Sequence, residues 1–435
     1  MIEERRKILS RAAREFDTPL YVYFMDDILA RFAELGRLFG DRFGVSYAVK
    51  ANPNTEILRR MAGHVTTFDV SSFAEAERVV AAGVAPRFVT FSGPAKRHEE
   101  LRRAIDWGVG ELVCESVAEA QRVDALARER GHLVDIMLRI NPQKVPRRFG
   151  ASMAGKPSQF GIDEEDMADA LDAVIRQTGT RLIGLHIYSG TNCLHADALQ
   201  ENFEIFLDIF RRACGHADLS PHKLVFGSGF GIPYLPDEDE LDIEDTAARL
   251  NPLIDALHAE SRFARTECVL EMGRWLIGRE GYLLTSVVQQ KRSRGTEIRI
   301  CDAGFNNHLA ACGMMGSVIR RNWRIAKVSG EAPSDGPLET CNLVGPLCTT
   351  IDLIATKIEL PALAPGDVLA IENSGAYGLT ASPTRFISHP EPREVIASGS
   401  GTLTEVTEST LNHWGPERPA RRDAVVKLPG TGVAR

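Results

Sequence analysis

The chain has 435 residues, of which 44% are hydrophobic and 25% charged, and its formal net charge is −8. These values are typical of a soluble globular protein too long for one ordinary core, so we expect two domains. The negative charge argues against non-specific nucleic-acid binding, which requires a basic surface. Residues 1–16 lack the apolar core of a signal peptide, and no apolar run approaches the roughly 20 residues that span a membrane. We therefore expect a cytoplasmic protein that does not bind membranes.

Eight short segments rich in β-branched and aromatic residues recur along the first two thirds of the chain, and each predicts a strand. They are 45–52, 66–72, 87–93, 111–116, 135–142, 182–190, 223–231 and 268–274. Between them, apolar residues three and four positions apart predict helices, for example over 73–83, 117–131 and 163–179. We expect the last of these helices to begin at Asp163 as its N-cap and to end at Gly179.

Strands that alternate with helices pair in parallel through crossover connections. Eight such units over about 230 residues have the size of a (β/α)₈ barrel, and a doubly wound open sheet is the alternative. Polar residues at the carboxyl ends of the predicted strands favour the barrel, because those ends form the face that carries the chemistry. These residues are Lys50, Asp69, Ser71, Arg139, His186, Ser189, Gly227 to Gly231 and Glu271.

The pattern changes after about residue 275, where strand-like segments follow one another with little helix between them. The segments are 281–293, 296–304, 341–348, 352–361, 367–375 and 392–398. Turn signals separate them, which predicts a second, mainly antiparallel β domain. The Pro- and Arg-rich tail from about residue 415 is expected to be flexible. Eight scattered cysteines without a C-x-x-C pair indicate neither a metal site nor a disulfide framework.

Lys50 stands at the end of the first predicted strand, in the apolar run VSYAVKAN. Burial there would lower the pKa of its amine and make the neutral form available as a nucleophile. The alternative is a lysine that reaches to the rim of the barrel or pairs with a carboxylate such as Asp69.

Two further motifs follow the seventh and eighth predicted strands. In FGSGFGI, residues 226–232, alternate glycines let backbone amides approach an anion, although a tight turn is an equal interpretation. In EMGR, Arg274 could hold phosphate oxygens and Glu271 could accept a hydrogen bond from a protonated ring nitrogen. A local salt bridge between these two side chains is the simpler alternative.

Four other side chains complete the set of chemical groups. His186 could lie flat against an aromatic ring or be a buried, hydrogen-bonded core residue, and Ser189 could donate to phosphate. Cys348 and Tyr377, in the predicted β domain, offer a weak acid and a phenol. An amine, a stacking ring, a partner for a pyridine nitrogen and a phosphate site together indicate pyridoxal 5′-phosphate.

The motifs YAVKAN, HIYSG, GSGFG, EMGR, GPLC and SGAYG occur in this order between about residues 47 and 378. In this set and order the chain resembles the alanine-racemase-like, fold type III pyridoxal-phosphate-dependent decarboxylases, which include the diaminopimelate, ornithine and arginine decarboxylases. The resemblance implies a barrel over residues 26–262 and a β domain built from 1–25 plus 263–435. It also implies a homodimer with shared active sites.

The resemblance further implies a role for each site residue. Lys50 would form a Schiff base with the cofactor, His186 would stack on its ring, and Glu271 would hold its pyridine nitrogen protonated. Cys348, from the other subunit, would deliver a proton to the product, with Asp352 and His308 near the substrate. Further implied cofactor contacts are Asp69, Arg139, Ser189, Gly227, Ser228, Gly229, Phe230, Gly231, Gly273, Arg274 and Tyr377.

Several positions depart from the family pattern. Ser228 replaces the middle glycine of the glycine loop, Met272 replaces a proline, and Tyr188 adds bulk near the phosphate site. In segment 305–322, His308 and Leu309 stand where diaminopimelate decarboxylases carry an arginine for the distal carboxylate. The segment is more similar to a branch serving secondary metabolism, some of whose members act on derivatised or carrier-bound substrates.

We therefore predict decarboxylation of an L-α-amino acid, free, derivatised or tethered to a carrier protein. An amino-acid racemase on the same scaffold is one alternative. The resemblance argues against it, because alanine racemases set an arginine against the pyridine nitrogen where this chain has Glu271. A catalytically silent homologue that regulates an active enzyme is the other alternative, and the intact Lys50, Arg274 and Cys348 argue against it.

Overall fold

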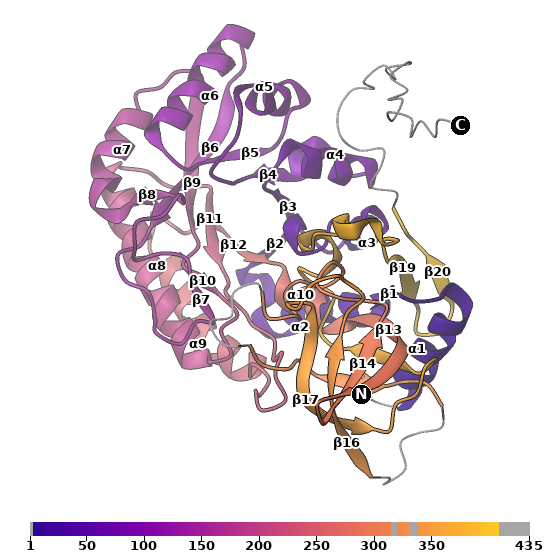
Figure 1. Cartoon of the computed structure of the whole chain (residues 1–435). Helices are drawn as coiled ribbons and strands as arrows, with labels where there is room; N and C mark the ends of the chain where they lie inside the picture. Colours follow the sequence, from indigo (N-terminus) through magenta and orange to yellow (C-terminus); the bar gives the residue numbers. More distant parts are fainter. Residues whose placement is uncertain (1–2, 315–319, 331–336, 409–435) are drawn as a thin grey trace, which may run out of the picture.

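A closed parallel barrel forms the first body of the protein, seen in a computed structural model that describes residues 3–314, 320–330 and 337–408, apart from the side chains of 151 and 152 (Figure 1). Its strands are β2 (Gly44–Ala48), β3 (Thr67–Val70), β4 (Val89–Phe91), β5 (Glu111–Cys114), β6 (Val134–Asn141), β9 (Thr180–Ile187), β11 (Lys223–Gly227) and β12 (Glu267–Met272). Each pairs in parallel with its neighbours, and the β12–β2 pairing closes the ring. The predicted (β/α)₈ barrel is confirmed, and the open doubly wound sheet is excluded.

Helices cover the outside of the barrel (Figure 1). They are α2 (Met25–Phe39), α3 (Thr55–Met61), α4 (Phe73–Ala81), α5 (His98–Trp107), α6 (Val117–Arg130), α7 (Met167–Val174), α8 (Ala196–His216) and α9 (Ile243–His258). Side-chain caps begin α3, α4, α6 and α9, and in α6 the Ser116 side chain accepts a hydrogen bond from the Glu119 N–H. Gly131, in the left-handed conformation, ends the same helix.

The predicted helix over 163–179 is shorter than expected. A single turn, η4 (Glu164–Asp166), precedes α7, and α7 ends at Val174, well before Gly179. Asp163 does not cap the helix with its side chain, because its carboxylate accepts a hydrogen bond of 2.8 Å from Asn141 instead. A tertiary partner on β6 thus replaces the local cap.

The barrel interior is a small, separate cluster of buried apolar side chains. Its members are Val113, Met137, Ile183, Val225 and Val269, one from each of five strands. Neighbouring strand residues such as Leu112 and Leu138 belong to the larger core instead. This alternation places one set of side chains inside the barrel and the other against the helices, as a closed parallel sheet requires.

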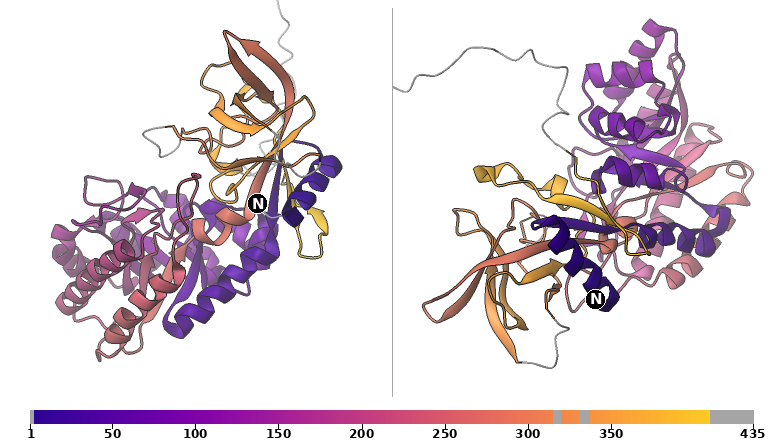
Figure 2. Two further views of the ribbon diagram at one scale, coloured as in Figure 1. Left: turned by 90° about the horizontal axis from the view of Figure 1, so that it is seen from below. Right: turned by 90° about the vertical axis from the view of Figure 1, so that its right-hand side faces the viewer.

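The second body is a mainly antiparallel sheet beside the barrel (Figure 2). Its strands are β1 (Leu20–Phe24), β13 (Gly281–Ser293), β14 (Thr296–Cys301), β15 (Ile325–Lys327), β16 (Leu338–Val344), β17 (Leu353–Pro361), β18 (Val368–Ile371), β19 (Arg393–Ala397) and β20 (Leu403–Glu405). Among the described strands of this second sheet, only the pairs β1–β19 and β14–β16 are parallel. The helix α1 (Glu3–Phe16) buries Leu9 and Ala12 against this sheet.

The segment 20–24 pairs with β13 and β19 of the second sheet, although it precedes the barrel in sequence. The division into 26–262 and 1–25 plus 263–435 stays a prediction. The tail from about 415 lies outside the described residues. Within those residues no helix is both long and apolar enough to cross a lipid bilayer.

Short elements connect the main strands and helices and complete the fold. They are the two-stranded pair β7 (Ala151–Ser152) and β10 (Gly190–Thr191), β8 (Ile162–Asp163), α10 (Arg274–Ile277), and the turns η1 (Gly40–Arg42), η2 (Val49–Ala51), η3 (Pro86–Phe88), η5 (Gly278–Glu280), η6 (Leu379–Ala381) and η7 (Phe386–Ser388).

Candidate active site

Lys50 lies on η2, directly after β2, and its amine meets two carboxylates. The distance from Nζ to Asp69 Oδ2 is 3.3 Å, and that from Nζ to Glu271 Oε1 is 3.2 Å. Because β2 pairs with β3 on one side and with β12 on the other, the sheet places one carboxylate on each side of the lysine. Both carboxylates are buried, while 39% of the Lys50 side chain stays exposed toward the cavity.

The amine of Lys50 is not poised as a neutral nucleophile in this arrangement, which corrects the expectation from its burial. Burial lowers the pKa, but the charges of Glu271 and Asp69 outweigh it and raise the Lys50 pKa well above its ordinary value. The alternative drawn from the sequence, a Lys50 paired with a carboxylate such as Asp69, is the arrangement observed, with Glu271 as a second partner. The chain therefore holds a protonated amine, which must lose its proton before it can attack a carbonyl group.

The two carboxylates differ in their affinity for protons. Burial raises the pKa of Glu271, but the nearby Lys50 ammonium and a hydrogen bond from His186 prevail and lower it below its usual range. Burial and repulsion from Glu271 raise the pKa of Asp69 to about 7. Glu271 thus keeps its charge at neutral pH, whereas Asp69 exchanges its proton there.

His186 lies on β9, and its Nε2 is 2.7 Å from Oε2 of Glu271. Burial lowers the pKa of His186, so the ring is neutral and donates its one proton from Nε2 to the carboxylate. Its Nδ1 is buried and has no hydrogen-bond partner among the described residues. The ring is therefore fixed in orientation by Glu271 and keeps one unused acceptor.

The loop 227–231 after β11 is packed too tightly for side chains at its glycines. A Cβ at Gly227 would lie 2.3 Å from the Tyr188 ring, and one at Gly231 would lie 2.8 Å from the backbone of Asn192. Gly229 has a φ of +69°, and a Cβ there would lie 2.5 Å from the ring of Phe149. The loop is a close-fitting backbone surface, as an anion held by backbone amides requires.

Arg274 begins α10 directly after Gly273 and lies among aromatic side chains. Its guanidinium is 4.7 Å from the centre of the Tyr377 ring, and its Nη1 donates a hydrogen bond to the Tyr234 hydroxyl. Its Nε is buried without a hydrogen-bond partner among the described residues. A buried guanidinium with an unused donor is suited to a phosphate group.

One cavity brings together eight of the residues predicted from sequence: Lys50, Ser228, Gly229, Phe230, Glu271, Gly273, Arg274 and Tyr377. Tyr188 also lines it, at the place where the sequence indicated added bulk. Sequence reasoning missed Ala48, Thr191 and Met272, all of which line the cavity. Each of the three had an available signal, because Ala48 and Met272 stand inside the motifs YAVKAN and EMGR and Thr191 directly follows HIYSG.

Three other predicted cofactor contacts lie close to this cavity but bond elsewhere or do not line it. Asp69 does not line the cavity, but its carboxylate pairs with the Lys50 amine, which does. Arg139 donates to Glu115 at 3.0 Å, and its guanidinium lies 4.6 Å from the centre of the Phe160 ring. The Ser189 hydroxyl donates to Asn202 Oδ1 at 2.5 Å, which directs it toward α8.

The three residues predicted to contact the substrate do not line the cavity. Cys348 is exposed on the turn between β16 and β17. The Asp352 carboxylate is buried and accepts hydrogen bonds from the Phe305 and Leu347 N–H groups, each 2.9 Å long. His308 packs edge-on against Trp323, and burial lowers its pKa to about 3, so its ring is neutral.

The residues of the cavity fit pyridoxal 5′-phosphate. A lysine amine can bond its aldehyde, a charged carboxylate can bind its ring nitrogen, and the glycine loop with the unused donor of Arg274 can bind its phosphate. A barrel that carries these groups at the carboxyl ends of its strands, joined to an antiparallel sheet, defines an enzyme that uses this cofactor.

The chain belongs to the family of pyridoxal-dependent decarboxylases: residues 25–278 match the family described as "Pyridoxal-dependent decarboxylase, pyridoxal binding domain". It is a pyridoxal 5′-phosphate-dependent decarboxylase of amino-acid substrates. It is 31% identical over 389 residues to the L-glutamyl-[BtrI acyl-carrier protein] decarboxylase of Niallia circulans, and the match covers 89% of this chain and 90% of that protein. It is 32% identical over 388 residues to the diaminopimelate decarboxylase of Methanothermobacter thermautotrophicus, covering 88% and 87%.

Among solved structures, the diaminopimelate decarboxylase of Helicobacter pylori complexed with L-lysine is similar, with a TM-score of 0.80 and 25% identity. The match covers 92% of this chain and 96% of that chain. The similarity therefore extends over both bodies of the fold, and the predicted family is confirmed.

Proposed function

We propose that the cavity around Lys50 is the site of decarboxylation and that Lys50 is the covalent anchor of the cofactor. The observation that carries this proposal is the convergence of the Lys50 amine, the charged Glu271 and the glycine loop in one cavity. Pyridoxal 5′-phosphate supplies an electron-withdrawing ring that stabilises the negative charge left on Cα when CO₂ departs.

The chain's own residues then have separate tasks. Glu271, with its lowered pKa, binds the ring nitrogen and favours its protonated form, and His186 holds Glu271 in place. Arg274 and the amides of the loop 227–231 bind the phosphate. Asp69, whose pKa is about 7, is suited to exchange a proton with the Lys50 amine.

We further propose that the substrate is an amino acid derivatised at its distal end, tethered to a carrier protein. Within the segment 305–322, residues 305–314 carry no charged side chain and His308 is neutral, while Arg320 lies against Gly313 and Arg321 pairs with Asp237. A free distal ammonium group thus has no carboxylate in this segment, and a free distal carboxylate has no cation at the start of the segment, where diaminopimelate decarboxylases carry their arginine. The relative from Niallia circulans is named for a carrier-bound substrate, which supports the same assignment.

The decisive measurement is CO₂ release from candidate amino acids, free and carrier-loaded, detected by mass spectrometry with the purified holoenzyme. Lys50→Ala is expected to abolish both turnover and the visible absorption band of the covalently held cofactor. A variant that keeps the band and full activity would remove Lys50 from the mechanism. Faster turnover of free diaminopimelate than of any carrier-loaded amino acid would refute the tethered substrate.

Cys348 is proposed as the proton donor to the product, contributed by the second subunit of a homodimer. Its exposure on the turn between β16 and β17 leaves its thiol available to a partner chain. A mixture of the inactive variants Lys50→Ala and Cys348→Ala tests this sharing. Random pairing would give half mixed dimers, each with one intact site of two, and therefore about one quarter of wild-type activity. Full activity of Cys348→Ala alone would exclude its role, and no recovery on mixing would place both residues in the same subunit.

A further inference from the structure

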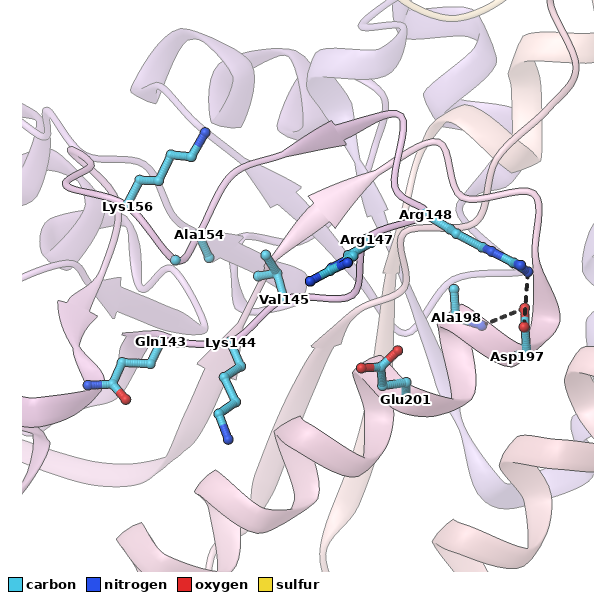
Figure 3. A pocket seen from close by; sticks show the side chains of 11 residues that line it. Gln143, Lys144, Val145, Arg147, Arg148, Ala154, Lys156, Asp197, Ala198 and Glu201 are labelled. Carbon is cyan, nitrogen blue, oxygen red and sulfur yellow. Dashed lines mark hydrogen bonds and ion pairs between the residues drawn. The ribbon is translucent and has the colours of Figure 1, made fainter.

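A wide, positively charged hollow opens between the loop that follows β6 and the first turns of α8 (Figure 3). We call it the basic hollow, and its volume is about 690 Å³. It is lined by Gln143, Lys144, Val145, Arg147, Arg148, Ala154, Gly155, Lys156, Asp197, Ala198 and Glu201. Its charged side chains are exposed, so water and solutes reach them freely.

Cations outnumber carboxylates in the basic hollow, although the whole chain carries a net charge of −8. Four cationic side chains line it, against the carboxylates of Asp197 and Glu201. Arg148 pairs with Asp197 at 3.1 Å, while the remaining three have no ion pair among the described residues. These are Lys144, Arg147 and Lys156. The excess positive charge is thus local and unneutralised by the fold.

The basic hollow shares a wall with the proposed active site. The ring of Phe149, in the same loop, packs against Gly229 of the glycine loop. The Met153 N–H donates to the Ser189 carbonyl at 2.8 Å, and β7 pairs with β10, whose Thr191 lines the cofactor cavity. A partner seated in the hollow would therefore stand at the edge of the cavity that holds Lys50.

We propose that the basic hollow docks the carrier protein that presents the tethered substrate, through carboxylates on the surface of that carrier. This inference rests on the proposed carrier-bound substrate. The hollow is open and its cations are exposed, which suits contact with a broad, acidic protein surface more than enclosure of a small anion. Its place beside the cavity lets a bound carrier extend its amino-acyl group toward Lys50.

Exposed cations of this kind act mainly on the rate and salt dependence of association. Because their charges are solvated, each contributes modestly, and their attraction for an acidic partner weakens as salt is added. Docking through the basic hollow thus predicts a KM effect that depends on ionic strength, and little effect on the chemical step.

The test uses the holoenzyme and the BtrI acyl-carrier protein loaded with L-glutamate as the probe. Arg147→Glu and the double variant Lys144→Glu/Lys156→Glu are expected to raise the KM for this probe by about tenfold at low ionic strength. Their kcat is expected to stay within about twofold of the wild type, and the KM difference is expected to disappear near about 0.5 M salt. The visible absorption of the bound cofactor should not change in either variant.

Arg176→Glu is the matched control. Arg176 is exposed between α7 and β9, at the opposite end of the barrel strands, and it has no ion pair among the described residues. The variant Arg176→Glu makes the same change in net charge as Arg147→Glu and is expected to leave the KM for the loaded carrier unchanged.

The outcomes separate the two proposals. Wild-type turnover of the loaded carrier with an unchanged KM in both hollow variants would overturn the docking surface and leave the proposed function standing. An equal rise in KM for Arg176→Glu would also overturn it, because the effect would then be one of net charge. No turnover of the loaded carrier by the wild type would overturn both the carrier-bound substrate and the docking surface.

Discussion

Replacing Lys50 by methionine in the protein without cofactor tests how much the ammonium contributes to stability by pairing with the two carboxylates around it. The change keeps the length of the side chain but removes the ammonium that lies 3.3 Å from Asp69 and 3.2 Å from Glu271. Removing one partner from a fully buried ion pair costs about 3–5 kcal/mol of unfolding free energy. Because 39% of the Lys50 side chain is exposed, water screens the interaction, and we expect a loss of about 2 kcal/mol at pH 8.

The loss should shrink as the pH falls. The pKa of Asp69 in the folded protein is about 7, above its unfolded value of about 3.9, so the folded state takes up this proton first. The protonated Asp69 therefore contributes stability that is complete below about pH 4 and lost as the pH rises through about 7. At pH 5.5 only Glu271 still carries a charge that needs Lys50, and the loss should fall to about half.

Urea unfolding of the two cofactor-free proteins at pH 8 and pH 5.5 measures both values. A second pair of proteins, Asp69→Asn with and without Lys50→Met, supplies the control. In this pair, Lys50→Met should lower the unfolding free energy by the same amount at both pH values. An undiminished loss at pH 5.5 in the first pair would refute the assignment of a titrating Asp69 beside a charged Glu271.

The remaining predictions concern the cofactor. Gly229→Ala should weaken pyridoxal 5′-phosphate binding by about tenfold in a spectroscopic titration, since φ is +69° and the new Cβ meets Phe149; unchanged affinity would show that the loop can relax. Arg274→Met should make the cofactor lost on dialysis, and Arg274→Lys should restore retention only in part, because lysine lacks the planar fork of donors. Glu271→Gln should lower kcat far more than cofactor affinity, and equal losses would point to a binding role alone.

The barrel could be predicted from sequence because its signals are local and repeated. Eight β-rich segments alternate with helical ones, and the structure has a strand in each of them. Capping is equally local where nothing competes with it, as at Ser116 before α6. Asp163 shows the limit of this reasoning, because Asn141, 22 residues earlier, takes up its carboxylate. A pattern within one segment carries no information about a partner on another strand.

The same limit explains what was missed at the site. Most residues of the cavity end or follow barrel strands, so the barrel geometry predicted their meeting, whereas Tyr377 follows β18 of the second sheet and barrel geometry does not place it. The charge state of Lys50 depends on how closely two separate strands bring Asp69 and Glu271, and sequence gives no distances. β15 and β20, of three residues each, were also missed, because such short segments show no periodicity.

The position of Lys50 also depends on the second body of the fold. The Tyr377 N–H donates to the Ala51 carbonyl at 2.8 Å, and the Asn52 side chain donates to the Gly375 carbonyl at 3.1 Å. These bonds join the two motifs VKAN and SGAYG, which lie more than 300 residues apart. Gly375 also packs against the end of α10, since a Cβ there would lie 2.0 Å from the Ile277 carbonyl oxygen. The turn that carries the lysine is therefore fixed from the antiparallel sheet as well as from β2, so the site needs both bodies to be formed.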